Sequence, residues 1–330
     1  MLSMHPIKVA LVIPVYDDWP SFNRLIQVID ELPELGRIEF DIFVVNDGSP
    51  VPPIGAESRF RHIRSIRLVN LLCNLGNQRA VAVGLVKASQ ERGVEGVIVM
   101  DSDGEDRPED IPRLIATALG NPGRIVCAQR VKRSESFSFR LFYLLYKTVF
   151  RMLSGEVIDF GNFSYIPRAE LDRLLHSPPL WNQLPATLIR SRVPLIRIPA
   201  ERGKRYFGRS SMKLDALVAH GLSAFSVYSD IVLVRLMIGM LAIAGLTAVG
   251  LAVAAGIRLF TDVAVPGWTT MVFSSLGIVL MQSLIFSVIS AFVLLNGRSV
   301  KPIIPAIDAL DFIASVEQRF VRPERTAKAS

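Results

Sequence analysis

An acidic stretch at residues 101–110 carries the side chains best suited to chemistry. It begins Asp101-Ser-Asp103 and directly follows a short apolar run, residues 97–100. Buried strands seldom end on several carboxylates for structural reasons alone, because like charges repel and are costly to bury. A divalent cation removes that cost, and Mg²⁺ or Mn²⁺ binds one or two carboxylates together with substrate phosphates. The alternative interpretation is a solvated acidic loop before a helix that begins at Pro108.

The elements that must position these acids alternate between strand and helix patterns over the first 130 residues. Apolar runs predict strands at residues 7–13, 40–45, 63–68, 97–100 and 125–128. Helical spacing predicts helices at residues 22–32, 78–90 and 111–119. This βαβα order predicts a mostly parallel sheet covered by helices, in which ligands bind beyond the carboxyl ends of the strands.

Polar clusters stand at three of these strand ends. They are Pro14-Val-Tyr-Asp-Asp18, Asn46-Asp-Gly-Ser49 and Asp101-Ser-Asp103. Parallel strands would bring all three to one edge of the sheet, which favours a binding site. The sequence has no glycine-rich phosphate loop of the GxGxxG or GxxxxGK[ST] type. A nucleotide bound here would therefore need a metal, rather than a helix N-terminus, to neutralise its diphosphate.

Two long segments, residues 236–257 and 268–295, contain no charged residue. They account for a mean hydropathy of +0.38, which is high for a soluble enzyme. A bilayer core needs roughly 20 apolar residues as helix, so both segments are long enough to span it. The apolar run near the N-terminus contains Lys8 and lacks a small-residue cleavage site, so it reads as a strand and not as a signal peptide.

The distribution of Lys and Arg predicts the orientation in the membrane. Lys213 and Arg235 precede the first span, Arg298 and Lys301 follow the second, and the link between the spans holds only Arg258. The positive-inside rule then places both termini and the large N-terminal region in the cytoplasm, in a multi-pass protein of the cytoplasmic membrane. The net charge of +7 is concentrated beside the spans, which favours membrane lipids and phosphorylated lipids over nucleic acid as partners.

Two further segments have the character of interfacial helices. Residues 137–153 are rich in aromatics and leucine, and Arg140, Lys147 and Arg151 share one helix face. The alternative for residues 137–153 is a core helix with a solvated basic stripe. Residues 214–228 are the second candidate for an interfacial helix. The expected domains are residues 1–213, an interfacial helix at 214–230, a transmembrane hairpin at 231–297 and a cytoplasmic tail at 298–330, with 321–330 disordered.

Taken in order, six short motifs resemble those of glycosyltransferase family 2 and of its polyprenyl-phosphate branch. They are Pro14-Val-Tyr, Asn46-Asp-Gly-Ser, Asn74-Leu-Gly-Asn-Gln-Arg-Ala80, Asp101-Ser-Asp103, Asp159-Phe-Gly-Asn-Phe163 and Arg205-Tyr-Phe-Gly-Arg-Ser210. The resemblance covers nearly the whole chain. It implies a GT-A fold, which is Rossmann-like with a mostly parallel sheet. It also implies an enzyme that transfers a sugar from a nucleotide-diphosphate sugar to a polyprenyl (undecaprenyl) phosphate with inversion.

The resemblance also implies a role for each matching residue. For the nucleotide sugar the binding residues would be Pro14, Tyr16, Asp18, Asp47, Asn74 and Asp101. The ligands of Mg²⁺ or Mn²⁺ would be Asp101, Asp103 and Glu105, and the catalytic residues Asp103, Arg205 and Asp159. The acceptor phosphate would meet Arg130, Arg133, Arg140 and Ser210. A homo-oligomer is left open.

The chain departs from the family pattern at three places. It has Asn46 and Asn162 where an acid is common, and Asp17-Asp18 where Asn-Glu is common. The rival hypotheses are a processive or other envelope-polysaccharide glycosyltransferase, a catalytically silent membrane scaffold or sugar-nucleotide sensor, and a nucleotidyltransferase. The chain lacks the Gln-x-x-Arg-Trp acceptor signature of the first, and the spans leave the third unexplained.

Overall fold

A computed structural model describes residues 6–51, 53, 60–130, 137–208, 214–261, 265 and 267–322. The chain divides into two compact units. The first, which we call the sheet unit, comprises Met1–Arg140, Ile158–Val227 and Ile303–Ser330. The second, the hairpin unit, comprises Leu141–Val157 and Tyr228–Pro302.

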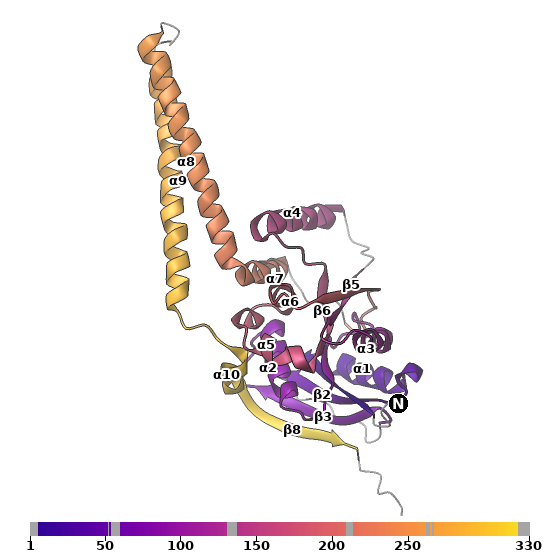
Figure 1. Ribbon diagram of the computed structural model, residues 1–330. Helices are drawn as coiled ribbons and strands as arrows, with labels where there is room; N and C mark the ends of the chain where they lie inside the picture. The colour runs from indigo at the N-terminus through magenta and orange to yellow at the C-terminus, as the bar shows by residue number, and fades with distance from the viewer. Residues whose placement is uncertain are drawn as a thin grey trace, which may run out of the picture. The chain divides into compact units, whose positions relative to one another are not determined.

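An eight-stranded sheet, in the order β7-β5-β6-β4-β1-β2-β3-β8, organises the sheet unit (Figure 1). The strands are β1 (Ile7–Val15), β2 (Ile38–Asn46), β3 (Ile63–Leu71), β4 (Gly96–Val99), β5 (Ile125–Arg130), β6 (Phe160–Pro167), β7 (Leu195–Ala200) and β8 (Ile313–Val321). Strands β4, β1, β2 and β3 are parallel neighbours, and β6 and β8 run antiparallel to theirs. The predicted mostly parallel sheet is confirmed.

Helices cover both faces of this sheet, because its central strands bury side chains on both sides. Along β1, Val9, Leu11 and Ile13 belong to one hydrophobic cluster, and Ala10 and Val12 belong to the other. The first cluster includes side chains of α1 (Trp19–Glu31) and α3 (Ile111–Leu119). The second includes side chains of α2 (Asn77–Ser89), α5 (Arg168–Leu175) and α6 (Leu184–Arg190). The result is a three-layer α/β/α arrangement.

The C-terminal segment differs from the sequence expectation. Residues 298–330 were expected to be a tail, but α10 (Pro305–Asp308) and β8 belong to the sheet unit, and β8 pairs with β3 from Ser65 to Leu71. In Figure 1 it is the yellow strand along the edge of the sheet. Most of β8 is exposed because it is the outermost strand, so the burial that would have produced a strong apolar alternation is absent.

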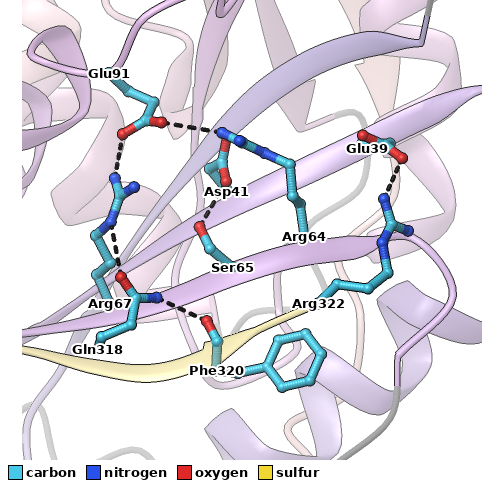
Figure 2. A network of polar contacts seen from close by, with 9 residues as sticks. All are labelled: Glu39, Asp41, Arg64, Ser65, Arg67, Glu91, Gln318, Phe320 and Arg322. Carbon is cyan, nitrogen blue, oxygen red and sulfur yellow. Dashed lines mark hydrogen bonds and ion pairs between the residues drawn. The ribbon is translucent and has the colours of Figure 1, made fainter. Parts of the chain in front are cut away.

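A polar network joins β8 to the sheet (Figure 2). Gln318 accepts a hydrogen bond from Arg67 Nε (3.3 Å) and donates to the Ile66 carbonyl (3.2 Å). Arg67 also pairs with Glu91, two residues after α2, and Arg322, just beyond β8, pairs with Glu39 of β2. These contacts attach the C-terminal strand directly to β3 and β2, and through Arg67 to Glu91.

We therefore expect a chain truncated after Pro302 to keep both apolar helices but to have a destabilised sheet unit. The loss removes the β3–β8 ladder and the edge-to-face contact of Phe320 with Phe60 (centroids 5.0 Å apart). Loss of one large packed aromatic alone costs about 3 kcal/mol. Thermal unfolding in detergent measures the effect, and removal of residues 323–330 alone is the control, because it retains β8. Equal melting temperatures for the two truncations would contradict the prediction.

Two long apolar helices, α8 (Ser229–Phe260) and α9 (Trp268–Ser299), form most of the hairpin unit. Only 11% and 17% of their most apolar windows are buried, so neither is the covered core helix of a soluble domain. Both are long and apolar enough to cross a membrane. Their buried side chains are small: Ala244, Thr247, Ala254, Ser283, Ser287 and Ser290. Small residues let apolar helices approach closely in lipid.

The second half of α4 (Phe137–Ser154) packs with the start of α8 inside the hairpin unit. Phe150 is buried and meets Tyr228 edge-to-face, with ring centroids 5.8 Å apart. Arg235 donates to the Met152 carbonyl (3.0 Å). Leu144 is 61% exposed on the same helix. An apolar exposed face beside Lys147 and Arg151 keeps the interfacial-helix prediction open.

Candidate active site

The carboxyl ends of β4, β1 and β2 are adjacent, so the three polar clusters meet at one edge of the sheet. Backbone hydrogen bonds hold the strand ends in register. The Asp47 N–H donates to the Val15 carbonyl (2.9 Å), and the Met100 N–H donates to the Val12 carbonyl (3.2 Å). The convergence predicted from strand order is confirmed.

The acidic loop after β4 is bound by arginines from the segment after β7. Asp103 Oδ2 lies 3.2 Å from Arg205 Nη2, whose other carboxylate neighbour is Asp18 Oδ2 at 3.7 Å. Glu105, the expected third metal ligand, accepts instead from Arg202 Nε (3.0 Å). Among the residues that the structure describes, no three His, Cys, Asp or Glu side chains are grouped to hold a metal ion. Asp101 and Asp103 are the remaining candidates.

The carboxyl group of Asp103 is electrostatically perturbed. Burial raises its pKa above the ordinary aspartate value, and the nearby Asp101 and Glu105 carboxylates add to the rise. The Glu105 N–H, which donates to Asp103 Oδ1 (2.9 Å), and the Arg205 guanidinium act in the opposite direction. A partly buried carboxylate whose charge is incompletely compensated is suited to bind a cation.

Close backbone contacts hold the segment after β7 against the acidic loop. The Gly203 N–H donates to the Glu105 carbonyl (2.8 Å), and the Tyr206 N–H donates to the Asp103 carbonyl (3.0 Å). A Cβ on Gly203 would lie 2.1 Å from the Gly104 carbonyl oxygen. Glycine is therefore required at 203 for Arg205 to reach Asp103.

We expect Gly203→Ala to separate these two segments. The added methyl meets backbone, which cannot move aside as a flexible side chain can, and overpacking of this kind costs about 1–3 kcal/mol. The activity of the site, measured as kcat/KM, should fall about tenfold or more as the Arg205–Asp103 pair lengthens. Gly208→Ala is the matched control, because a Cβ there meets nothing within 4 Å, although its φ of +71° adds strain. Equal losses in both variants would count against the close-contact explanation.

The residues expected from the first strand end divide into two groups. Pro14 is buried within β1 and pairs with Val45 in the ladder, so it belongs to the core of the sheet. Tyr16 is 54% exposed at the same end, and Asp18 lies beside Arg205. Asp17 between them has a φ of +53°. The exposed Tyr16 ring and the Asp18 carboxylate are thus the parts of this cluster available to a ligand.

Asp47 takes a backbone-binding role. The side chain is 3% exposed, and its two oxygens accept from the Leu75 N–H (2.7 Å) and the Gly76 N–H (3.0 Å). Burial raises the pKa of Asp47, and these two hydrogen bonds act to lower it. Asp47 therefore fixes the loop before α2, where Asn74 is exposed, and both its oxygens are already engaged without a nucleotide.

An amide network beside Asp101 was missed by the residue-by-residue sequence reasoning. Asn77 Nδ2 donates to Asp101 Oδ1 (3.1 Å), and Asn162 donates to Asn77 (3.4 Å). Gln78 donates to Asn162 Oδ1 (3.0 Å) and accepts from the Leu184 N–H (2.8 Å). The signal was present, since Asn77 and Gln78 stand inside the motif at residues 74–80.

Asp159, expected to be catalytic, has different partners. Its carboxylate accepts from Gln129 Nε2 (2.7 Å) and from Arg197 Nε (3.0 Å). Asn162, not Asp159, is the residue of this motif that connects to Asp101, through Asn77. The arrangement gives Asp159 a part in joining β5, β6 and β7 at their ends.

Two of the expected acceptor-phosphate residues, Arg133 and Ser210, lie outside the described residues, as do the side chains of Arg130 and Arg140. These four assignments stay predictions. The expected disorder of residues 321–330 is wrong at Val321, which ends β8, and at Arg322, which pairs with Glu39. Residues 323–330 lie outside the described residues.

The match to a family model agrees with this fold and site. Residues 10–169 match the model "Glycosyl transferase family 2". This part of the chain is similar to glycosyltransferase family 2, has the GT-A fold, and contains the three strand-end clusters.

Solved structures with a similar fold include two sugar-transferring enzymes. Glucosyl-3-phosphoglycerate synthase from Mycobacterium tuberculosis, in complex with Mn²⁺, uridine diphosphate and glucosyl-3-phosphoglycerate, is 17% identical over 67% of this chain and 80% of that one, with a TM-score of 0.47. Mannosyl-3-phosphoglycerate synthase from Rubrobacter xylanophilus is 17% identical over 79% of this chain and 78% of that one, with a TM-score of 0.47.

Proposed function

We propose that this protein is a membrane-bound glycosyltransferase that moves a sugar from a nucleotide-diphosphate sugar to a polyprenyl phosphate, with inversion at the anomeric carbon. One observation carries the proposal: Asp101, Asp103, Asp18 and Arg205 gather at the carboxyl edge of a glycosyltransferase family 2 domain whose chain continues into two exposed apolar helices.

The residues at this edge fit a divalent cation held with a diphosphate. Asp101 and Asp103 supply hard oxygen donors, and Mg²⁺ or Mn²⁺ needs only one or two protein carboxylates when phosphates complete its shell. Arg205 Nε is buried and, among the described residues, has no hydrogen-bond partner. An anionic ligand would satisfy that donor. When bound, the metal would stabilise negative charge on the leaving diphosphate.

The reaction requires the protein to position the two substrates and to compensate their negative charges, more than to transfer protons. A phosphate monoester has a second pKa of about 6, so at cytoplasmic pH it is already a competent nucleophile. No general base is then required, and His62 and His176 each use Nδ1 on a backbone carbonyl. Arg205 binds a phosphate through its planar fork and offsets the repulsion between donor and acceptor anions.

The two apolar helices support a lipid acceptor in place of a small soluble one. A polyprenyl chain lies in the bilayer, and an enzyme fixed there meets it at high effective concentration. The family resemblance supplies the acceptor phosphate residues Arg130, Arg133, Arg140 and Ser210, and arginine is suited to grip that phosphate in a bidentate manner. Both termini and the sheet unit would lie on the cytoplasmic side, where nucleotide sugars are available.

The decisive test is transfer from a panel of radiolabelled UDP- and GDP-sugars to undecaprenyl phosphate in membranes, with and without Mn²⁺ or Mg²⁺. We expect a metal-dependent, acid-labile lipid product from one donor. Nucleotide binding without any lipid product would contradict the acceptor assignment. Absence of both binding and product would favour a silent scaffold.

A further inference from the structure

A chain of side-chain hydrogen bonds crosses three strands at the carboxyl edge of the sheet. Asn46 of β2 faces Asn70 of β3, and Asn70 faces Ser315 of β8, in the strand register. Asn46 Nδ2 donates to Asn70 Oδ1 (2.9 Å). Asn70 Nδ2 donates to Ser315 Oγ (2.9 Å) and to Glu317 Oε1 (2.8 Å).

Glu317, at the outer end of this series of hydrogen bonds, determines which group of each pair donates and which accepts. An ionised carboxylate only accepts hydrogen bonds, so Glu317 requires the Asn70 amide nitrogen to face it. Arg319 pairs with the other oxygen of Glu317 (2.8 Å) and keeps it in place. Asn70 therefore presents its oxygen to Asn46, which must donate. A carboxylate at position 46 could not donate, which accounts for the amide at a position where the family commonly has an acid.

Asn46, at the inner end of this series of hydrogen bonds, holds the loop that follows β2. Asn46 Oδ1 accepts from the Ser49 N–H (3.0 Å), and Ser49 Oγ accepts from the Asp17 N–H (3.0 Å). Asp17 has a left-handed backbone, φ +53°, directly before Asp18, whose carboxylate lies 3.7 Å from Arg205. Side chains on β8 are thus connected, one hydrogen bond at a time, to the backbone on which Asp18 stands.

We infer that β8 takes part in the donor site by setting the conformation of residues 46–49 through this chain. Asn46, Asn70 and Glu317 are then positioning residues for nucleotide binding. The inference rests on the proposed function, because it assumes that the strand-end loops bind a nucleotide. It extends the donor site to a strand that follows the apolar hairpin and lies outside the matched residues 10–169.

A polarity swap tests the inference on the full chain in detergent. UDP and GDP, each with Mn²⁺, serve as probes by calorimetric titration. Asn70→Asp places a carboxylate opposite Glu317 and should weaken binding of the preferred nucleotide about tenfold. Adding Glu317→Gln restores a donor at position 317, and the double variant should return to within about twofold of the native affinity. A purely structural role predicts coupled changes in melting temperature, with native nucleotide affinity in both variants.

Arg322→Gln is the matched control. It weakens the attachment of β8 to Glu39, which Figure 2 shows. It leaves the Asn46–Asn70 hydrogen bond intact. It should lower the melting temperature without changing nucleotide affinity, and amide exchange at residues 46–49 should accelerate in Asn70→Asp alone. Native affinity in Asn70→Asp, or no recovery in the double variant, overturns the inference. If the native protein binds neither nucleotide, the proposed donor and the inference are both overturned. If nucleotide affinity is the same in the native protein and in all three variants, only the inference is overturned.

Discussion

Replacing Asp103 with asparagine is expected to lower kcat/KM for sugar transfer by about a thousandfold or more, while the protein still inserts into membranes. The substitution keeps the side-chain size and an oxygen that accepts from the Glu105 N–H. It removes the negative charge of the Asp103 carboxyl group, whose pKa is raised by burial. A bound divalent ion contributes several kcal/mol of charge stabilisation, and each ~1.4 kcal/mol lost is a tenfold loss of rate. Initial rates over a range of Mn²⁺ concentrations measure the effect.

Glu105→Gln tests whether Glu105 is a metal ligand or only the partner of Arg202. If Glu105 were a third metal ligand, its loss would resemble that of Asp103. Since Glu105 pairs with Arg202 in the structure, we expect a much smaller loss, with an unchanged dependence on Mn²⁺. Full activity in Asp103→Asn would remove the metal assignment, and equal losses in both variants would restore the three-ligand set.

The second large effect is expected for Arg205→Ala. This variant should lose transfer by about a hundredfold in kcat, because the fork that offsets developing negative charge is removed at a partly buried site. Nucleotide affinity should stay nearly unchanged. The pairing of Arg205 with Asp103 and Asp18 explains why this guanidinium is held in place before any ligand arrives.

The matched control is Arg202→Ala, which removes a neighbouring guanidinium that is more exposed and pairs with Glu105. Its effect on kcat should be small. Single-turnover measurements separate binding from chemistry for both variants. An unaltered transfer rate in Arg205→Ala would exclude it from the site, and equal effects in both would indicate a general charge effect.

The order of strands and helices along the first 130 residues and the strand-end acids could be predicted from the sequence, because both follow from local patterns. Apolar runs identify buried strands, and parallel strands necessarily place Asp18, Asp47 and Asp101 at one edge. The long uncharged segments identified both apolar helices, α8 and α9, for the same reason: length and composition are properties of the sequence itself.

The partners of individual carboxylates could not be predicted, because they depend on loop conformation. Asp47 binds two backbone N–H groups that only the turn at Gly76, with a φ of +85°, brings together. Asp159 meets Arg197 from a strand 38 residues away. Neither pairing leaves a periodic pattern. The sequence showed which residues could bind a ligand, but not which of them the fold itself already uses.

Because β8 comes after the hairpin in the chain, the sheet can be completed only after the hairpin has been synthesised. A ribosome produces β1 to β7 first, then α8 and α9, and the strand that covers β3 last. Until then β3 is an open edge, the kind of surface that pairs wrongly with other chains. If the hairpin crosses a membrane as proposed, a nascent chain that stalls during insertion would keep an incomplete sheet. Completion of the sheet is therefore coupled in time to the synthesis of the two apolar helices.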